Sequence, residues 1–157
     1  MSAGGCYDPA RLSTSNYPIL TSVSGRIYIA GNPGLTTYDN AFPRLTRIGT
    51  YLHLSSNPAV TTLGDAFPVL VELGTDGQPG AYGGGISLYL VSHERLTTLG
   101  TAFASLRRIR GALYINGNPL LTDFEALRNL ECHGGPFQPS TCQGCPGWLL
   151  AKPRCQL

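Results

Sequence analysis

Cysteine is the residue type whose spacing in this chain points most directly to chemistry. Four of the five cysteines, Cys132, Cys142, Cys145 and Cys155, fall in the last 26 residues, with nine, two and nine residues between neighbours. Two disulfides would staple a cap over one end of the fold, and four thiolates binding one Zn²⁺ would do the same. We expect disulfides, because Cys142-x-x-Cys145 is only half of a zinc pattern; zinc and free thiols are the alternatives. Cys6 is left over, and we expect it to pair outside the chain or to mark the start of a truncated domain.

The other residues with catalytic potential do not form a recognisable pattern. Neither Gly-x-Ser-x-Gly nor His-Glu-x-x-His occurs. The repeat described below places no Asp or Cys beside His53 or His93. Four aspartates fall at different repeat positions, so they do not form a pair: Asp39, Asp65, Asp76 and Asp123. We therefore expect no enzyme activity, no cofactor and no metal site.

Composition narrows the class of protein further. Of 157 residues, 42% are hydrophobic, which is enough to bury one core, and only 13% are charged. The net charge is +2 and no basic stripe with interleaved aromatic residues occurs, so nucleic acid is not an expected partner. No apolar run reaches the length of a membrane span. The first 12 residues lack the features of a signal peptide.

An internal repeat of 25 residues predicts the secondary-structure elements that position these residues. Leu20, Leu45 and Leu70 are 25 residues apart; Leu106 follows after 36, which is 25 plus an insertion of 11, and Leu130 after a further 24. The same steps separate Phe42, Phe67 and Phe103. A repeat of this period indicates a solenoid, in which each unit buries its apolar face only by stacking on the next.

Each unit contains three short apolar segments separated by turn residues. The middle segments, IYI, LHL, LYL and LYI, alternate with period two, as a strand does. We predict a mainly β fold: a right-handed parallel β-helix of about four coils with a Cys-rich C-terminal cap. The expected parts are an N-terminal cap (1–18), the repeats (19–131, with an insertion at 75–85) and a cap or the start of a following module (132–157).

The repeat units resemble the receptor L domain, the leucine-rich-repeat-like β-helix of insulin and epidermal growth factor receptors and of fungal cell-surface proteins. The resemblance covers about residues 19 to 132 and rests on GRIYIAGNPGLTTY from Gly25 and GALYINGNPLLTDF from Gly111. The third unit departs from it, with His93-Glu94 in place of Asn-Pro. The resemblance implies a non-enzymatic module at the cell surface or outside the cell. Such a module would bind a protein or carbohydrate ligand, with further domains in a longer protein.

The strand alternation also predicts a row of aromatic side chains. The inward residues would be Ile27, Ile29, Leu52, Leu54, Leu88, Leu90, Leu113 and Ile115. Tyr28, His53, Tyr89 and Tyr114 lie between them, so we expect their rings to stack on one solvent face. Such a row could serve stability alone or bind a ligand. At about 19 Å by 10 Å it offers about 200 Å², well below the roughly 800 Å² per partner of a stable protein interface.

Three further features accompany this face: a flanking tyrosine, an insertion and a row of asparagines. Tyr51 lies in a flanking row, and the Gly-rich insertion 75–85 carries Tyr82, either as a tolerated loop or as a flap over the aromatic row. Asn32, Asn57 and Asn118 share a corner, where we expect them to hydrogen-bond the backbone of neighbouring coils, with His93 taking the same role in the third coil.

Two rows of threonines form the last candidate binding surface. One row holds Thr36, Thr61, Thr97 and Thr122, and a second holds Thr37, Thr62 and Thr98. Stacked threonines resemble the surface of ice-binding solenoids. Adjacent threonines in a strand cannot both point outward, however, so ice binding is only a minor alternative. A structural spacer or surface-coat domain with no discrete site is the main alternative to a binding module.

Overall fold

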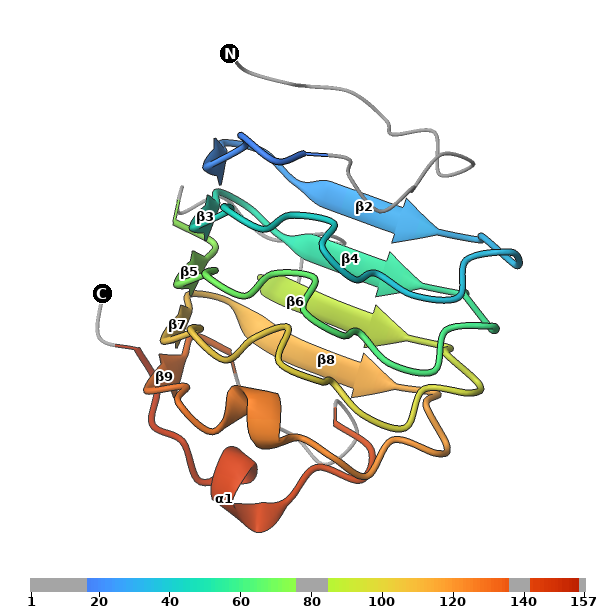
Figure 1. Cartoon of the computed structure of the whole chain (residues 1–157). Helices are drawn as coiled ribbons and strands as arrows, with labels where there is room; N and C mark the ends of the chain where they lie inside the picture. Colours follow the sequence, from blue (N-terminus) through green and yellow to red (C-terminus); the bar gives the residue numbers. More distant parts are fainter. Residues whose placement is uncertain (1–16, 76–84, 136–141, 156–157) are drawn as a thin grey trace.

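The computed structural model describes residues 17–75, 85–135 and 142–155. Over these ranges the chain is a parallel β-solenoid of about four coils, and each strand lies beside its equivalent in the next coil (Figure 1). The predicted fold is therefore confirmed, including a C-terminal region that contains cysteines. The proposed N-terminal cap falls almost wholly outside the described residues, and Cys6 and Tyr82 lie outside them too.

Two parallel sheets form two sides of each coil. The first sheet has the order β1-β3-β5-β7-β9 and the second has the order β2-β4-β6-β8. The strands of the first sheet are β1 (Ser22–Val23), β3 (Arg47–Ile48), β5 (Glu72–Leu73), β7 (Arg108–Ile109) and β9 (Cys132–His133). Those of the second sheet are β2 (Ile27–Ala30), β4 (Leu52–Ser55), β6 (Ile86–Val91) and β8 (Ala112–Asn116). The third side is held by isolated parallel bridges that join Thr37, Thr62, Thr98 and Asp123 in turn.

The strand register follows the sequence repeat. In the second sheet Tyr28 pairs with His53, His53 with Tyr89, and Tyr89 with Tyr114. One irregularity occurs between Ile86 and Leu88, where the register against β8 shifts. This bulge directly follows the insertion, so it absorbs the mismatch before the aromatic row begins.

The core is built from rows of equivalent apolar side chains stacked along the solenoid axis. The eight inward residues predicted for the second sheet are all buried. At another corner the rings of Tyr17, Phe42, Phe67 and Phe103 stack almost in parallel, with centroids 5.2, 5.1 and 5.9 Å apart. Each coil thus completes the apolar contacts of the one before it, as expected of a repeat that cannot bury its core alone.

The C-terminal segment closes one end of the stack. Disulfides join Cys132 to Cys155 and Cys142 to Cys145, so the predicted choice of disulfides is confirmed. Parallel bridges from Cys142 to Ile115 and from Arg154 to His133 extend both sheets by one further step. A 3₁₀ turn, η2 (Glu125–Leu127), and a short helix, α1 (Gly147–Leu150), complete this end (Figure 1).

Within the described ranges, none of the helices has the length and apolar character needed to cross a bilayer.

Candidate functional site

The aromatic row of the second sheet is formed by one residue from each of four neighbouring strands. The ring centroids of Tyr28 and His53 are 4.4 Å apart, those of His53 and Tyr89 are 5.0 Å apart, and those of Tyr89 and Tyr114 are 5.8 Å apart. The first two pairs are stacked and the third is tilted. Parallel in-register strands hold equivalent side chains about one strand spacing apart, which is why a sequence repeat produces a ring stack.

Solvent exposure differs along the row, and this corrects the sequence expectation. Tyr28 is 43% exposed and Tyr114 is half-buried, but His53 and Tyr89 are only 6% and 5% exposed. The prediction that all four rings are exposed to solvent is therefore wrong for the two central rings, those of His53 and Tyr89. Each of them lies between two aromatic rings of the row, and Tyr51 also packs edge-on against Tyr89 with centroids 6.4 Å apart.

Polar contacts fix the rings and set the charge of the row. His53 Nε2 hydrogen-bonds Ser55 Oγ at 2.8 Å, and burial lowers the pKa of His53, which keeps it neutral near pH 7. The Tyr114 hydroxyl accepts a hydrogen bond from Asn116 Nδ2 at 3.3 Å. The guanidinium of Arg26 lies over the ring of half-buried Tyr51, 5.9 Å from its centroid. Together these contacts hold the aromatic row and Tyr51 as one rigid, uncharged surface, which we call the aromatic strip. Arg26 places a cation at its edge.

The Asn corner is a buried ladder that joins neighbouring coils. Asn57 Oδ1 accepts from the backbone N–H of Asn32 at 2.8 Å, and Asn57 Nδ2 donates to Ile29 O at 3.3 Å. Asn118 repeats the arrangement two coils on, accepting from the backbone of His93 and donating to Leu90 O. Asn57 and Asn118 therefore satisfy backbone groups of the preceding coil, which is a structural role, whereas Asn32 Nδ2 donates to the side-chain oxygen of Asn57 at 3.0 Å.

His93 does not take the Asn role that the repeat predicts for it. Its Nε2 instead lies 3.2 Å from the Tyr38 hydroxyl, which also accepts from Asn57 Nδ2 at 2.6 Å. Burial lowers the pKa of His93 to about 4 and raises the pKa of Tyr38, so both are neutral. Tyr38 stands in a row otherwise filled by Leu63, Leu99 and Phe124, and this departure from the repeat is the sequence signal for the network.

The two threonine rows differ in what they present. The row of Thr36, Thr61, Thr97 and Thr122 is exposed, whereas the row of Thr37, Thr62 and Thr98 is half-buried. Each hydroxyl of the second row accepts a hydrogen bond from the backbone N–H two residues later. These local turns use the second row to shape the corner, which leaves one exposed threonine row.

Chemically, the aromatic strip can stack against an apolar ring face and exchange hydrogen bonds through the phenol groups of Tyr28 and Tyr114. Among the described residues, no group of three or more His, Cys, Asp or Glu side chains is placed to hold a metal ion. Comparison with protein-family models, with curated proteins and with solved structures finds no match to this chain. The geometry and the sequence are therefore the basis for a functional assignment.

Proposed function

We propose that this protein is a non-enzymatic recognition module of the receptor L-domain type that binds a carbohydrate through the exposed rings of the second sheet. The observation that carries the proposal is the exposed ring of Tyr28 stacked on a buried and neutral His53. A ring held from behind by a rigid stack loses little conformational freedom when a ligand packs against it, so its contact area is available for binding.

The size of the exposed strip favours a sugar unit over a protein as the direct ligand. Within the described ranges, the rings of this face that present surface are those of the exposed Tyr28 and of the half-buried Tyr114 and Tyr51. A protein ligand would need about 800 Å² per partner, and further domains or loops would have to supply it. Disulfides are typical of oxidising compartments, which supports a location outside the cell or at its surface.

A glycan array probed with purified protein tests the proposal. The double variant Tyr28→Ala/Tyr114→Ala removes the outer rings and leaves the buried pair in place. We expect it to lose about tenfold or more in affinity for any glycan that the natural protein binds, since aromatic contacts contribute about 0.5–1.5 kcal/mol each beyond their buried area. The matched control is Val69→Ala/Leu120→Ala, which truncates two exposed apolar side chains away from this sheet. Equal glycan binding by both variants would show that the site is misplaced.

A structural spacer with no discrete site is the second candidate. The burial of His53 and Tyr89 favours it, because a buried ring stack contributes to stability without any ligand. A spacer would bind no glycan on the array, and Tyr28→Ala would then change only the unfolding midpoint.

A further inference from the structure

The charged side chains of the described residues are distributed unevenly around the solenoid. The first sheet and its flanking segments carry eight of the ten Lys and Arg residues in the described ranges, but only three of the seven Asp and Glu residues. The eight cations are Arg44, Arg47, Arg107, Arg108, Arg110, Arg128, Lys152 and Arg154. This side is thus more positive than the net charge of +2 indicates.

Five of these cations follow the solenoid axis and define what we call the basic face: Arg47, Arg107, Arg108, Arg110 and Arg154. Arg47 and Arg108 share one register row with Glu72 between them, so they are two strand spacings apart, about 9.5 Å. Arg154 lies one step beyond β9, where its bridge to His133 places it in the neighbouring register row of Ile48, Leu73 and Ile109. From β3 to Arg154 the basic face spans about 19 Å.

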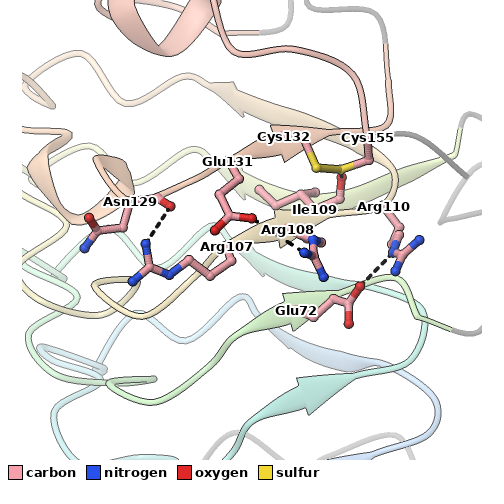
Figure 2. A network of polar contacts seen from close by, with 9 residues as sticks. All are labelled: Glu72, Arg107, Arg108, Ile109, Arg110, Asn129, Glu131, Cys132 and Cys155. Atoms are coloured by element: carbon pink, nitrogen blue, oxygen red, sulfur yellow. Dashed lines mark hydrogen bonds and ion pairs between the residues drawn. A yellow bond between two sulfur atoms is a disulfide. The ribbon is translucent and has the colours of Figure 1, made fainter.

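Acids pair with two of the five arginines of the basic face. The buried Glu72 carboxylate accepts from Arg110 Nε at 2.7 Å, and Glu131 Oε2 lies 3.6 Å from Arg108 Nη2 (Figure 2). Arg107 Nη1 donates to the backbone carbonyl of Asn129 at 3.4 Å. Glu72 is buried, whereas Glu131 is exposed together with Arg47, Arg107, Arg108 and Arg154, so the exposed part of the face carries more arginines than carboxylates.

We propose that the basic face binds an acidic polysaccharide through its carboxylate or sulfate groups. Guanidinium groups match these anions in shape and charge. Cations spread over about 19 Å along one sheet suit an extended chain of anions better than a single small one. Single-stranded nucleic acid is disfavoured because its binding surfaces interleave aromatic rings with cations, and the outward row of this sheet is Ser22, Arg47, Glu72, Arg108 and Cys132. This site is separate from the aromatic strip and does not depend on it.

The test measures binding of the full chain to polygalacturonate, to dextran sulfate and to neutral dextran. The first two probes separate carboxylate from sulfate recognition. The double variant Arg47→Ser/Arg107→Ser leaves the ion-paired Arg108 and Arg110 intact. Its matched control, Arg44→Ser/Arg95→Ser, removes the same charge from exposed cations that belong neither to the basic face nor to the aromatic strip. We expect binding to at least one polyanion and none to neutral dextran. The first variant should lose about tenfold in affinity, and the slope of log K against log salt should become shallower by about one to two.

Several outcomes would overturn the proposal. An equal loss in both double variants would mean that net charge alone drives binding. Absence of binding to both polyanions at low salt would exclude the basic face as a polyanion site. Tighter binding to duplex DNA or to phosphatidylserine vesicles than to either polysaccharide would assign the face to a different partner. Retained glycan-array binding in these cases would leave the aromatic site standing, so the two proposals fail independently.

Discussion

At the scale of single residues, the most informative position is His93. It occupies a row otherwise filled by Asn32, Asn57 and Asn118, yet its side chain contacts the hydroxyl of Tyr38, a core residue from a different coil. The two unusual residues occur together because a buried phenol needs a hydrogen-bond partner that Leu or Phe would not need. Asn57 completes the arrangement by donating to the same hydroxyl.

This burial predicts that the protein loses stability in mild acid. The pKa of His93 is about 4 in the folded protein against an ordinary value of 6.5, so between these values only the unfolded chain binds the proton. The free energy of unfolding should therefore keep its full value above pH 6.5 and should decrease as the pH drops toward 4. The loss should be about 3 kcal/mol, at about 1.36 kcal/mol per unit. Chemical denaturation at a series of pH values measures it.

The matched variant for this prediction is His93→Asn, which restores the residue of the other coils. Its free energy of unfolding should depend less on pH between 4 and 6.5 than that of the natural protein. A residual slope of the same sign should remain, since burial also lowers the pKa of His53 and His133. An unchanged pH profile would show that His93 is not the titrating group.

At the scale of elements, contacts between equivalent side chains of successive coils contribute more to stability than any single strand does. The first-sheet strands have only two residues each, too few to form a stable sheet without the layers beneath them. The phenylalanine stack is one such layer, because Phe67 lies between Phe42 and Phe103 and is completely buried. Its ring therefore ties three successive coils together.

Replacing Phe67 by Ala should be one of the most destabilising single changes in the chain. The lost burial and the cavity between two rings predict a cost of about 3–5 kcal/mol. The exposed Leu120→Ala is the control, with an expected change below about 0.5 kcal/mol. Urea unfolding followed by circular dichroism compares them. A cost under about 1 kcal/mol for Phe67→Ala would mean that the coils do not unfold as one cooperative unit.

At the scale of the whole molecule, the end of the stack is closed by covalent bonds. The Cys132–Cys155 disulfide joins β9 to the segment that extends the first sheet. The Cys142–Cys145 disulfide lies where the last segment bridges to Ile115 of the second sheet. Each sheet edge at this end is therefore held near one disulfide, which limits pairing with other chains.

The two disulfides should contribute unequally to stability. Cys132 and Cys155 are separated by 23 residues, and Cys142 and Cys145 by only 3. Loop-closure entropy predicts about 3 kcal/mol for the first bond and about 2 kcal/mol for the second. The variants Cys132→Ala/Cys155→Ala and Cys142→Ala/Cys145→Ala compare them by thermal unfolding. A larger loss in the second variant would contradict the entropic account.

The sequence alone determined the repeat, the rows and the parallel register. A period of 25 places equivalent residues in adjacent coils, so which residues share a row follows from counting. The inward positions of the second sheet were predictable for the same reason, whereas the cysteine-containing end was predicted from the spacing of its cysteines. Neighbours within one row are set by the period and require no knowledge of the shape of a coil.

Tertiary structure decided everything that depends on contacts between rows. The pairing of Tyr38 with His93, the burial of His53 and Tyr89, the choice of disulfide partners and the pairing of Glu72 with Arg110 are all of this kind. Such contacts join residues from different sides of a coil or from different segments, and the repeat period does not encode their distances. They follow from the cross-section of the coil, which depends on how the turns bend and how side chains of different size pack together.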